Sequence, residues 1–279
     1  MKPSTFTRDG VRLAYAESGA GRPFIFQHGL GADSRQTFDL LGGLPDRRLI
    51  AMDARAHGSS EVGLEQKIGF DTFGCDLRGL FDALGISKAV VGGLSMGAGI
   101  SLNFALKHPE MVSALILVRP AWVDEPMEAR ELYFAVAKAI RQYGPARGRD
   151  AFLASEVYRQ VSMQFPDTAK SLLGQFDSVR AEDGVVRLER MPADAPDHDR
   201  NRWSTLKIPV LVLAHQDDPV HPLTCGRAIA GAISQAKFVE ITPKSVDRER
   251  HEAEIRKEVA EFLESAESDV AASRQSFSV

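Results

Sequence analysis

A serine set between two glycines, where an apolar run gives way to small residues, constrains this chain more than any other feature. Residues 89–92 are apolar or glycine and predict a buried strand, and residues 96–107 predict a helix. Between them Ser95 is the centre of a G-x-S-x-G sequence whose outer glycines are Gly93 and Gly97. A serine on so tight a turn has strained torsions, and the positions two before and two after it must be small. The segment therefore predicts an exposed serine nucleophile.

Apolar runs alternate with helix-like segments along most of the chain. The sequence Asp9-Gly10 separates two alternating segments and predicts a hairpin at the start. Strands are predicted at residues 23–27, 48–52, 89–92, 114–118, 208–214 and 237–241, and helices at 35–41, 71–84, 96–107 and 248–263. Because these strands are apolar throughout, they predict a mostly parallel sheet with helices on both faces.

The pattern changes between Trp122 and Trp203. Charged helical segments at residues 127–143, 149–163 and 167–180 occur there without a clear strand. We predict that residues 122–203 form a helical cap over the carboxyl ends of the strands, where ligands bind in α/β sheets. The core would then comprise residues 1–121 and 204–266, with a disordered tail at 267–279.

Composition argues against several kinds of partner. A net charge of −4 and a pI near 6.0 provide no basic field for nucleic acid or an anionic membrane. No signal peptide or membrane span is recognisable, so we expect a cytoplasmic protein. Cys75 and Cys225 are isolated and receive no role. The spacing of the glycines does not fit a dinucleotide or phosphate loop, and no metal signature occurs. We therefore expect no cofactor and no metal; the oligomeric state stays open.

Further motifs accompany the serine turn in a recognisable order. Residues 28–31 read His-Gly-Leu-Gly, and residues 53–60 read Asp-Ala-Arg-Ala-His-Gly-Ser-Ser. With these motifs the chain resembles the α/β-hydrolase superfamily from Gly10 to Leu263. The resemblance implies an eight-stranded, mostly parallel sheet flanked by helices, with a helical cap insertion.

The same resemblance implies an oxyanion hole. The backbone N–H groups of Leu30 and Met96 would donate to the oxyanion that forms beside the nucleophile. His28 and His57, which lie in the two glycine-bearing loops, are interpreted as structural residues.

A candidate acid follows the apolar run at 208–214. Asp218 precedes Pro-Val in residues 215–222, as in the acid loop of the family, and would hold an imidazole in one tautomer. Asp217 is the alternative. Either aspartate could instead cap the next helix, which is common for this residue type.

The base departs from the family pattern. The family usually has Gly-His shortly after the proline that ends its last strand, but Asp247 occupies that position here. We predict His251, four residues further on, as the base. A solvated His251 in a charged run is an equally good interpretation. His221 is less favoured because it neighbours Asp218 in sequence.

These residues predict a serine hydrolase for a small carboxylic ester or lactone. Cleavage of an amide or a carbon–carbon bond by the same groups remains an alternative, as does a ligand-binding homologue without a base. The substrate would be a small molecule, and Arg119, with Arg200 and Arg202, is a candidate contact for an anionic one. Aromatic residues of the insertion are candidates for the pocket wall: Trp122, Tyr133, Phe134, Phe152 and Tyr158.

Overall fold

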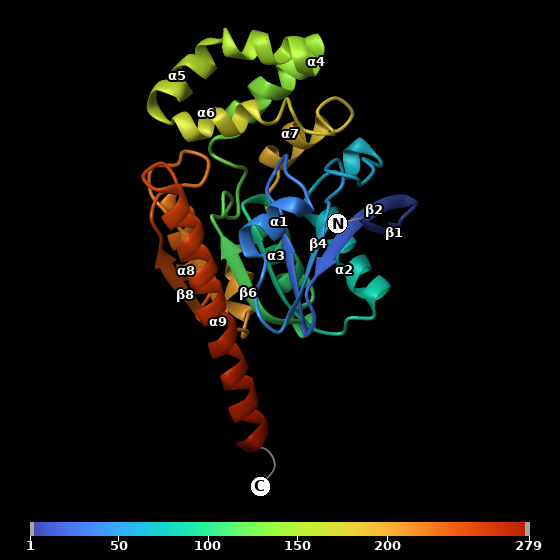
Figure 1. Cartoon of the computed structure of the whole chain (residues 1–279), viewed down its shortest axis with the longest axis vertical. Helices are drawn as coiled ribbons and strands as arrows, with labels where there is room; N and C mark the ends of the chain where they lie inside the picture. Colours follow the sequence, from blue (N-terminus) through green and yellow to red (C-terminus); the bar gives the residue numbers. More distant parts are fainter. Residues whose placement is uncertain (1–2, 277–279) are drawn as a thin grey trace.

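Eight strands form one sheet in the order β1-β2-β4-β3-β5-β6-β7-β8 (Figure 1) in the computed structural model, which describes residues 3–276 and the side chains of residues 3–266. The strands are β1 (Ser4–Arg8), β2 (Val11–Ser18), β3 (Arg22–Gln27), β4 (Arg47–Met52), β5 (Ala89–Leu94), β6 (Val112–Val118), β7 (Val210–Ala214) and β8 (Ala236–Glu240). β2 pairs antiparallel with β1 and β4, and the other neighbours are parallel. The predicted fold class is confirmed.

The predicted hairpin connects β1 and β2. Arg8 pairs with Val11, and Asp9 and Gly10 between them have φ values of 51° and 75°. Positive φ at both central residues is typical of the two-residue turn whose twist matches that of the strands.

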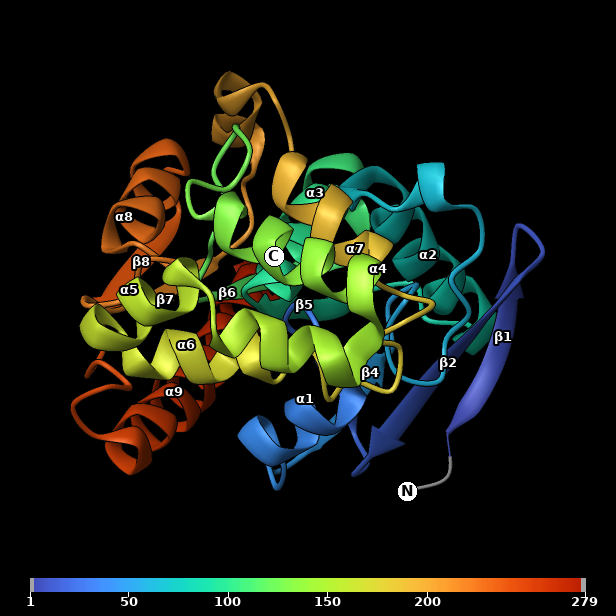
Figure 2. The ribbon, with the colours of Figure 1, turned by 90° about the horizontal axis from the view of Figure 1, so that it is seen from above.

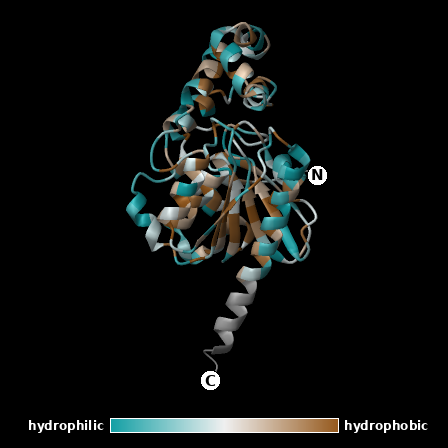
Figure 3. Ribbon diagram, turned by 90° about the vertical axis from the view of Figure 1, so that its left-hand side faces the viewer, coloured by the Kyte–Doolittle hydropathy of each residue, from teal (hydrophilic) through white to brown (hydrophobic). Residues whose placement is uncertain are grey.

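Helices cover both faces of the sheet because its side chains alternate between two apolar clusters. Phe24 and Phe26 of β3 belong to one cluster and Ile25 to the other, and all three are buried. Each such side chain stabilises the fold by about 2 kcal/mol. Figure 3 shows the apolar colour concentrated in the strands. Helices α1 (Ser34–Leu41) and α9 (Arg248–Ser276) cover the first cluster, and α2 (Phe70–Leu84), α3 (Met96–Lys107) and α8 (Leu223–Ala232) cover the second.

The insertion between β6 and β7 is helical and lies above the carboxyl ends of the strands (Figures 1 and 2). It contains α4 (Arg130–Leu153), α5 (Glu156–Gln164), α6 (Pro166–Leu173) and α7 (Val186–Arg190). A kink divides α4, because Gly144 has a φ of 75° and is followed by Pro145. The kink falls between the first two predicted helical segments.

A buried arginine attaches the insertion to the core. The Nη1 atom of Arg187 in α7 donates to the carbonyl oxygens of Arg180, at 2.6 Å, and of Ala56, at 3.4 Å. Burial lowers the pKa of Arg187 to about 10. The contact with Ala56 links the cap to a loop of the sheet domain.

The chain ends in α9, which extends beyond the sheet away from the cap (Figure 1). We predict disorder for residues 267–279; the side chains of this segment, and the last three residues altogether, lie outside the described part of the chain. Within residues 3–276, no helix is both long and apolar enough to span a bilayer.

Candidate active site

Ser95 lies on a strained turn between β5 and α3. Its φ and ψ are 56° and −112°, and its amide donates to the carbonyl oxygen of Val118 at 2.9 Å. A Cβ atom on Gly93 would overlap the backbone of Gly97, and one on Gly97 would overlap the carbonyl of Gln27. The two glycines are therefore sterically required, as predicted.

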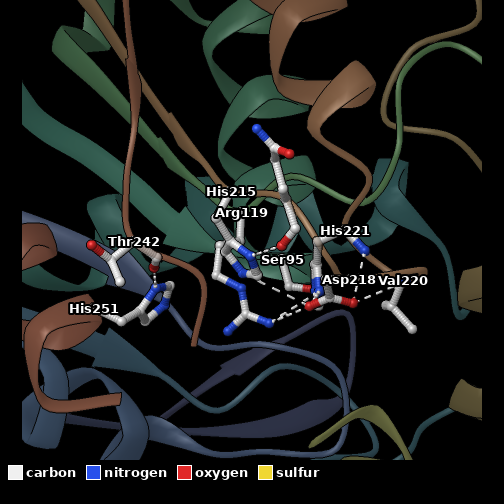
Figure 4. A network of polar contacts seen from close by, with 9 residues as sticks. Ser95, Arg119, His215, Asp218, Val220, His221, Thr242 and His251 are labelled. Atoms are coloured by element: carbon white, nitrogen blue, oxygen red, sulfur yellow. Dashed lines mark hydrogen bonds and ion pairs between the residues drawn. The ribbon is translucent and has the colours of Figure 1, made fainter. Parts of the chain in front are cut away.

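A histidine and an aspartate from one loop lie beside the serine (Figure 4). The Nε2 atom of His221 is 2.8 Å from Oγ of Ser95, and Nδ1 of His221 is 2.8 Å from Oδ2 of Asp218. Oδ1 of Asp218 accepts from the backbone amides of Val220, at 3.0 Å, and His221, at 3.3 Å. These bonds fold the loop after β7 so that the imidazole of His221 points at Ser95. Asp218, His221 and Ser95 therefore form a chain of hydrogen bonds.

His251 is not in that chain, which corrects our expectation that it lies beside Ser95. Its Nδ1 atom is 2.7 Å from the carbonyl oxygen of Thr242, and its ring packs edge-on against His215 with centroids 5.0 Å apart. Both rings are buried, which lowers the pKa of each histidine to about 4. Because α9 begins at Arg248, it holds His251 against the loop after β8, to one side of Ser95 (Figure 4). The alternative interpretation, in which His251 is a solvated residue of a charged run, is therefore also wrong.

The other two aspartates considered from the sequence lie at the surface. Asp217 is exposed, has a φ of 60° and contacts no histidine in the described chain. Asp247 is exposed and accepts from the amide of Arg250 at 2.9 Å, so it caps the start of α9. Of the two candidate acids, Asp218 and Asp217, only Asp218 contacts a histidine that reaches Ser95.

Arg119 adds a positive charge next to Asp218 and His221. It follows β6 with a φ of 48°, and its Nη2 atom lies 2.7 Å from Oδ2 of Asp218 and 3.2 Å from Nδ1 of His221. Burial by itself raises the pKa of Asp218, but His221 and Arg119 outweigh it and hold that pKa well below the usual range. Burial lowers the pKa of His221, Asp218 raises it, Arg119 lowers it again, and the result is below 6.5. At neutral pH Asp218 is therefore ionised and His221 is neutral, the states that a general base requires.

The two backbone amides predicted for the oxyanion hole belong to residues near the serine turn. Met96 is the first residue of α3, where helix N–H groups have no partner within the helix. Leu30 follows Gly29, at which an added Cβ would lie 3.6 Å from Cβ of Ser95. Neither the Leu30 nor the Met96 amide donates a hydrogen bond to another described residue. Both donors are free to bind an oxygen.

His28 and His57 are buried in the loops that support this region. Nε2 of His28 accepts from the amide of Ala54 at 3.1 Å, and Nδ1 of His57 lies 2.8 Å from the carbonyl oxygen of Arg55. Their ring centroids are 5.0 Å apart. The two histidines connect the loops at residues 28–31 and 53–60, which agrees with a structural role.

Two cavities open between the sheet and the cap. One, of about 260 Å³, lies against α6 and the acid loop and is lined by residues that include Tyr133, Asp218 and His221. The other, of about 610 Å³, lies against α1 and the start of α9. Of the candidate aromatic residues only Tyr133 lines either one; Trp122 and Phe152 are buried in the core.

The three candidate arginines separate in the structure. Arg200 forms an ion pair with Asp124, and Arg202 forms one with Asp197 at 3.0 Å. Arg119 alone lines the cavities. Among residues 3–266, no group of three or more His, Cys, Asp or Glu side chains is placed to hold a metal ion.

A sequence signal for His221 was present, although His251 was predicted as the base. An aspartate and a histidine three positions apart, with a proline after each, form a loop that can curl back on itself. Asp218 and Pro219 are followed by Val220, His221 and Pro222, and Pro222 ends the loop directly before α8.

Comparison with known proteins agrees with this architecture. Residues 22–245 match the family model of the alpha/beta hydrolase fold, so the chain belongs to the α/β-hydrolase family. It is 27% identical over 242 residues to the 2-hydroxy-6-oxo-6-phenylhexa-2,4-dienoate hydrolase of Comamonas testosteroni, covering 81% of this chain and 82% of that protein. It is 39% identical over 113 residues to the putative 2-succinyl-6-hydroxy-2,4-cyclohexadiene-1-carboxylate synthase of Bacillus subtilis strain 168, covering 39% of this chain. That alignment and those with three further curated relatives cover between 36% and 44% of those proteins.

Solved structures share the fold over nearly the whole chain. The thermophilic esterase of Thermogutta terrifontis, solved with malate bound, has a TM-score of 0.71 and 28% identity, covering 94% of this chain and 99% of that one. The enol-lactonase of Burkholderia xenovorans LB400 has a TM-score of 0.73 and 23% identity, covering 93% and 99%. The latter likeness concerns the fold.

Proposed function

We propose that the protein is a serine hydrolase that cleaves a small carboxylic ester or lactone through an acyl-enzyme on Ser95. The observation that carries the proposal is the 2.8 Å separation between Nε2 of His221 and Oγ of Ser95. A base within hydrogen-bond reach is what separates a catalyst from a ligand-binding homologue of the same fold.

In the proposed mechanism His221 takes the proton of Ser95 as Oγ attacks the substrate carbonyl. The amides of Leu30 and Met96 bind the oxyanion of the tetrahedral intermediate. Asp218 keeps the Nδ1 proton of His221 in place and stabilises the imidazolium. The imidazolium then protonates the leaving alcohol as the carbon–oxygen bond breaks. Water, deprotonated by His221, attacks the acyl-enzyme and releases the acid.

Cleavage of a carbon–carbon bond is the second candidate. It is favoured by the similarity over 242 residues to the Comamonas testosteroni dienoate hydrolase. The same nucleophile and base serve either reaction, so the arrangement around Ser95 does not discriminate between them.

Labelling with a fluorophosphonate tests the nucleophile, because such reagents modify only an activated serine at an appreciable rate. We expect labelling at Ser95 that Ser95→Ala abolishes and His221→Gln slows by several orders of magnitude. Ser101→Ala is the matched control, since Ser101 is also buried and on α3 but makes no side-chain hydrogen bond. A folded wild-type protein that is not labelled would contradict the proposal.

A substrate panel then separates the two reactions. It contains p-nitrophenyl esters, simple lactones and a ring-cleavage diketone. Faster turnover of esters and lactones supports the first candidate, and turnover of the diketone alone supports the second.

A further inference from the structure

Two cationic side chains lie where the two cavities under the cap meet. The residues that line both cavities are Arg119 and Lys244. Arg119 comes from the end of β6, and Lys244 comes from the loop after β8. Arg119 contacts Asp218 and His221, and His221 contacts Ser95, so Arg119 is one side chain away from the serine.

Neither cation is fully paired by the protein. Arg119 uses Nη2 for Asp218, but its Nε is buried and has no hydrogen-bond partner, and its Nη1 donates to no described residue. No carboxylate lies within ion-pair distance of the Lys244 ammonium in the described chain. Asp218, which faces both, already accepts from His221 and from two backbone amides.

The electrostatic environment of Lys244 agrees with the incomplete pairing of the two cations. Burial lowers the pKa of Lys244, and the positive charges of Arg119 and Arg248 lower it further, although Asp167 and Asp218 act in the opposite direction. Two cations held close together in a partly buried site repel each other. An anion between them would relieve that repulsion and accept a hydrogen bond from the unpaired Nη1 of the Arg119 guanidinium.

We propose that Arg119 and Lys244 form a carboxylate-binding subsite, and that the substrate is an ester or lactone bearing a second, anionic carboxylate. This inference rests on the proposed function. A guanidinium presents parallel N–H groups that match a carboxylate, and an ammonium adds a point charge. The cavity of about 260 Å³, which is lined by Arg119, Lys244 and His221, has room for a chain of a few carbons.

The kinetic test compares mono-p-nitrophenyl glutarate with p-nitrophenyl valerate, which differ only in a terminal carboxylate or methyl group. For the wild type we expect kcat/KM to favour the glutarate ester, and Lys244→Gln to lower that preference about tenfold. Lys244→Arg should restore most of it. Lys207→Gln is the matched control, because Lys207 is exposed and lines neither cavity.

A binding test does not depend on turnover. Monomethyl glutarate and methyl valerate are titrated calorimetrically into Ser95→Ala, with and without Lys244→Gln. We expect tighter binding of the glutarate ester and a loss of about tenfold in its affinity when Lys244 is changed. An equal effect on both ligands, or no binding of the glutarate ester, overturns the subsite. Lysine-dependent binding without hydrolysis in the wild type overturns the proposed function alone.

Discussion

Asp218 and His221 are three residues apart on one loop, and their side chains are 2.8 Å from each other. The carboxylate bonds both to the ring and to the backbone that carries the ring. One residue therefore sets both the position and the tautomer of the imidazole. His221 then meets Ser95, 126 positions earlier in the chain.

Replacing each of two buried histidines separates the candidate bases. We expect His221→Gln to lower kcat by at least about 10³-fold, because the nucleophile loses its proton acceptor. His251→Gln should retain most of the activity, since the ring of His251 contacts Thr242 and His215 instead of Ser95. The measurement is steady-state hydrolysis by proteins whose circular dichroism matches the wild type. The reverse order of losses would restore His251 as the base.

The acid limb of the pH profile reports the charge around His221. The pKa of His221 is below 6.5, and the base works only when neutral, so activity should persist below pH 6.5. Arg119 is one cause of the lowering. We therefore expect Arg119→Met to move the acid limb of kcat/KM to higher pH, even if its rate is lower throughout. An unchanged limb would mean that Arg119 does not act on the base.

Gly97→Ala tests the steric requirement of the serine turn. A methyl group there overlaps the carbonyl of Gln27, so we expect a loss of at least about 2 kcal/mol in the free energy of unfolding. Gly231→Ala is the control, because nothing lies within 4 Å of the added carbon in α8. That variant should be as stable as the wild type or more so. Urea denaturation of the three proteins measures both effects.

Buried neutral histidines make stability depend on pH. The pKa values of His215 and His251 are about 4 when folded, and the unfolded chain binds protons near 6.5. Because the unfolded state binds more protons between these values, stability is complete above pH 6.5 and falls as the pH drops toward 4. We expect the melting temperature to decrease over that interval. The double variant His215→Gln and His251→Gln should show a shallower decrease, and an identical slope would contradict this account.

The sequence predicted those features that follow from local sterics. The turn at Ser95 needs small residues on both sides, and the alternation of strands and helices requires a covered parallel sheet. Both requirements are visible in the residues themselves. The histidine beside Ser95 was not predicted, because its position depends on the turn at Asp217 and on the bonds that Asp218 makes to the backbone. Neither is encoded in the spacing of histidines, and a pattern taken from relatives pointed to the loop after β8.

Asp218 and His221 both lie on the loop after β7, so the sheet edge formed by β8 and α9 does not have to supply either residue. Among the side chains that the structure describes, none from β8 or α9 belongs to the hydrogen-bonded chain of Asp218, His221 and Ser95, although Lys244 borders the cavities. The bonds between Asp218 and His221 form within one loop and do not depend on a hydrogen bond from that edge. We therefore expect substitutions in β8 and at the start of α9 to change ligand contacts while Asp218 and His221 keep their mutual position.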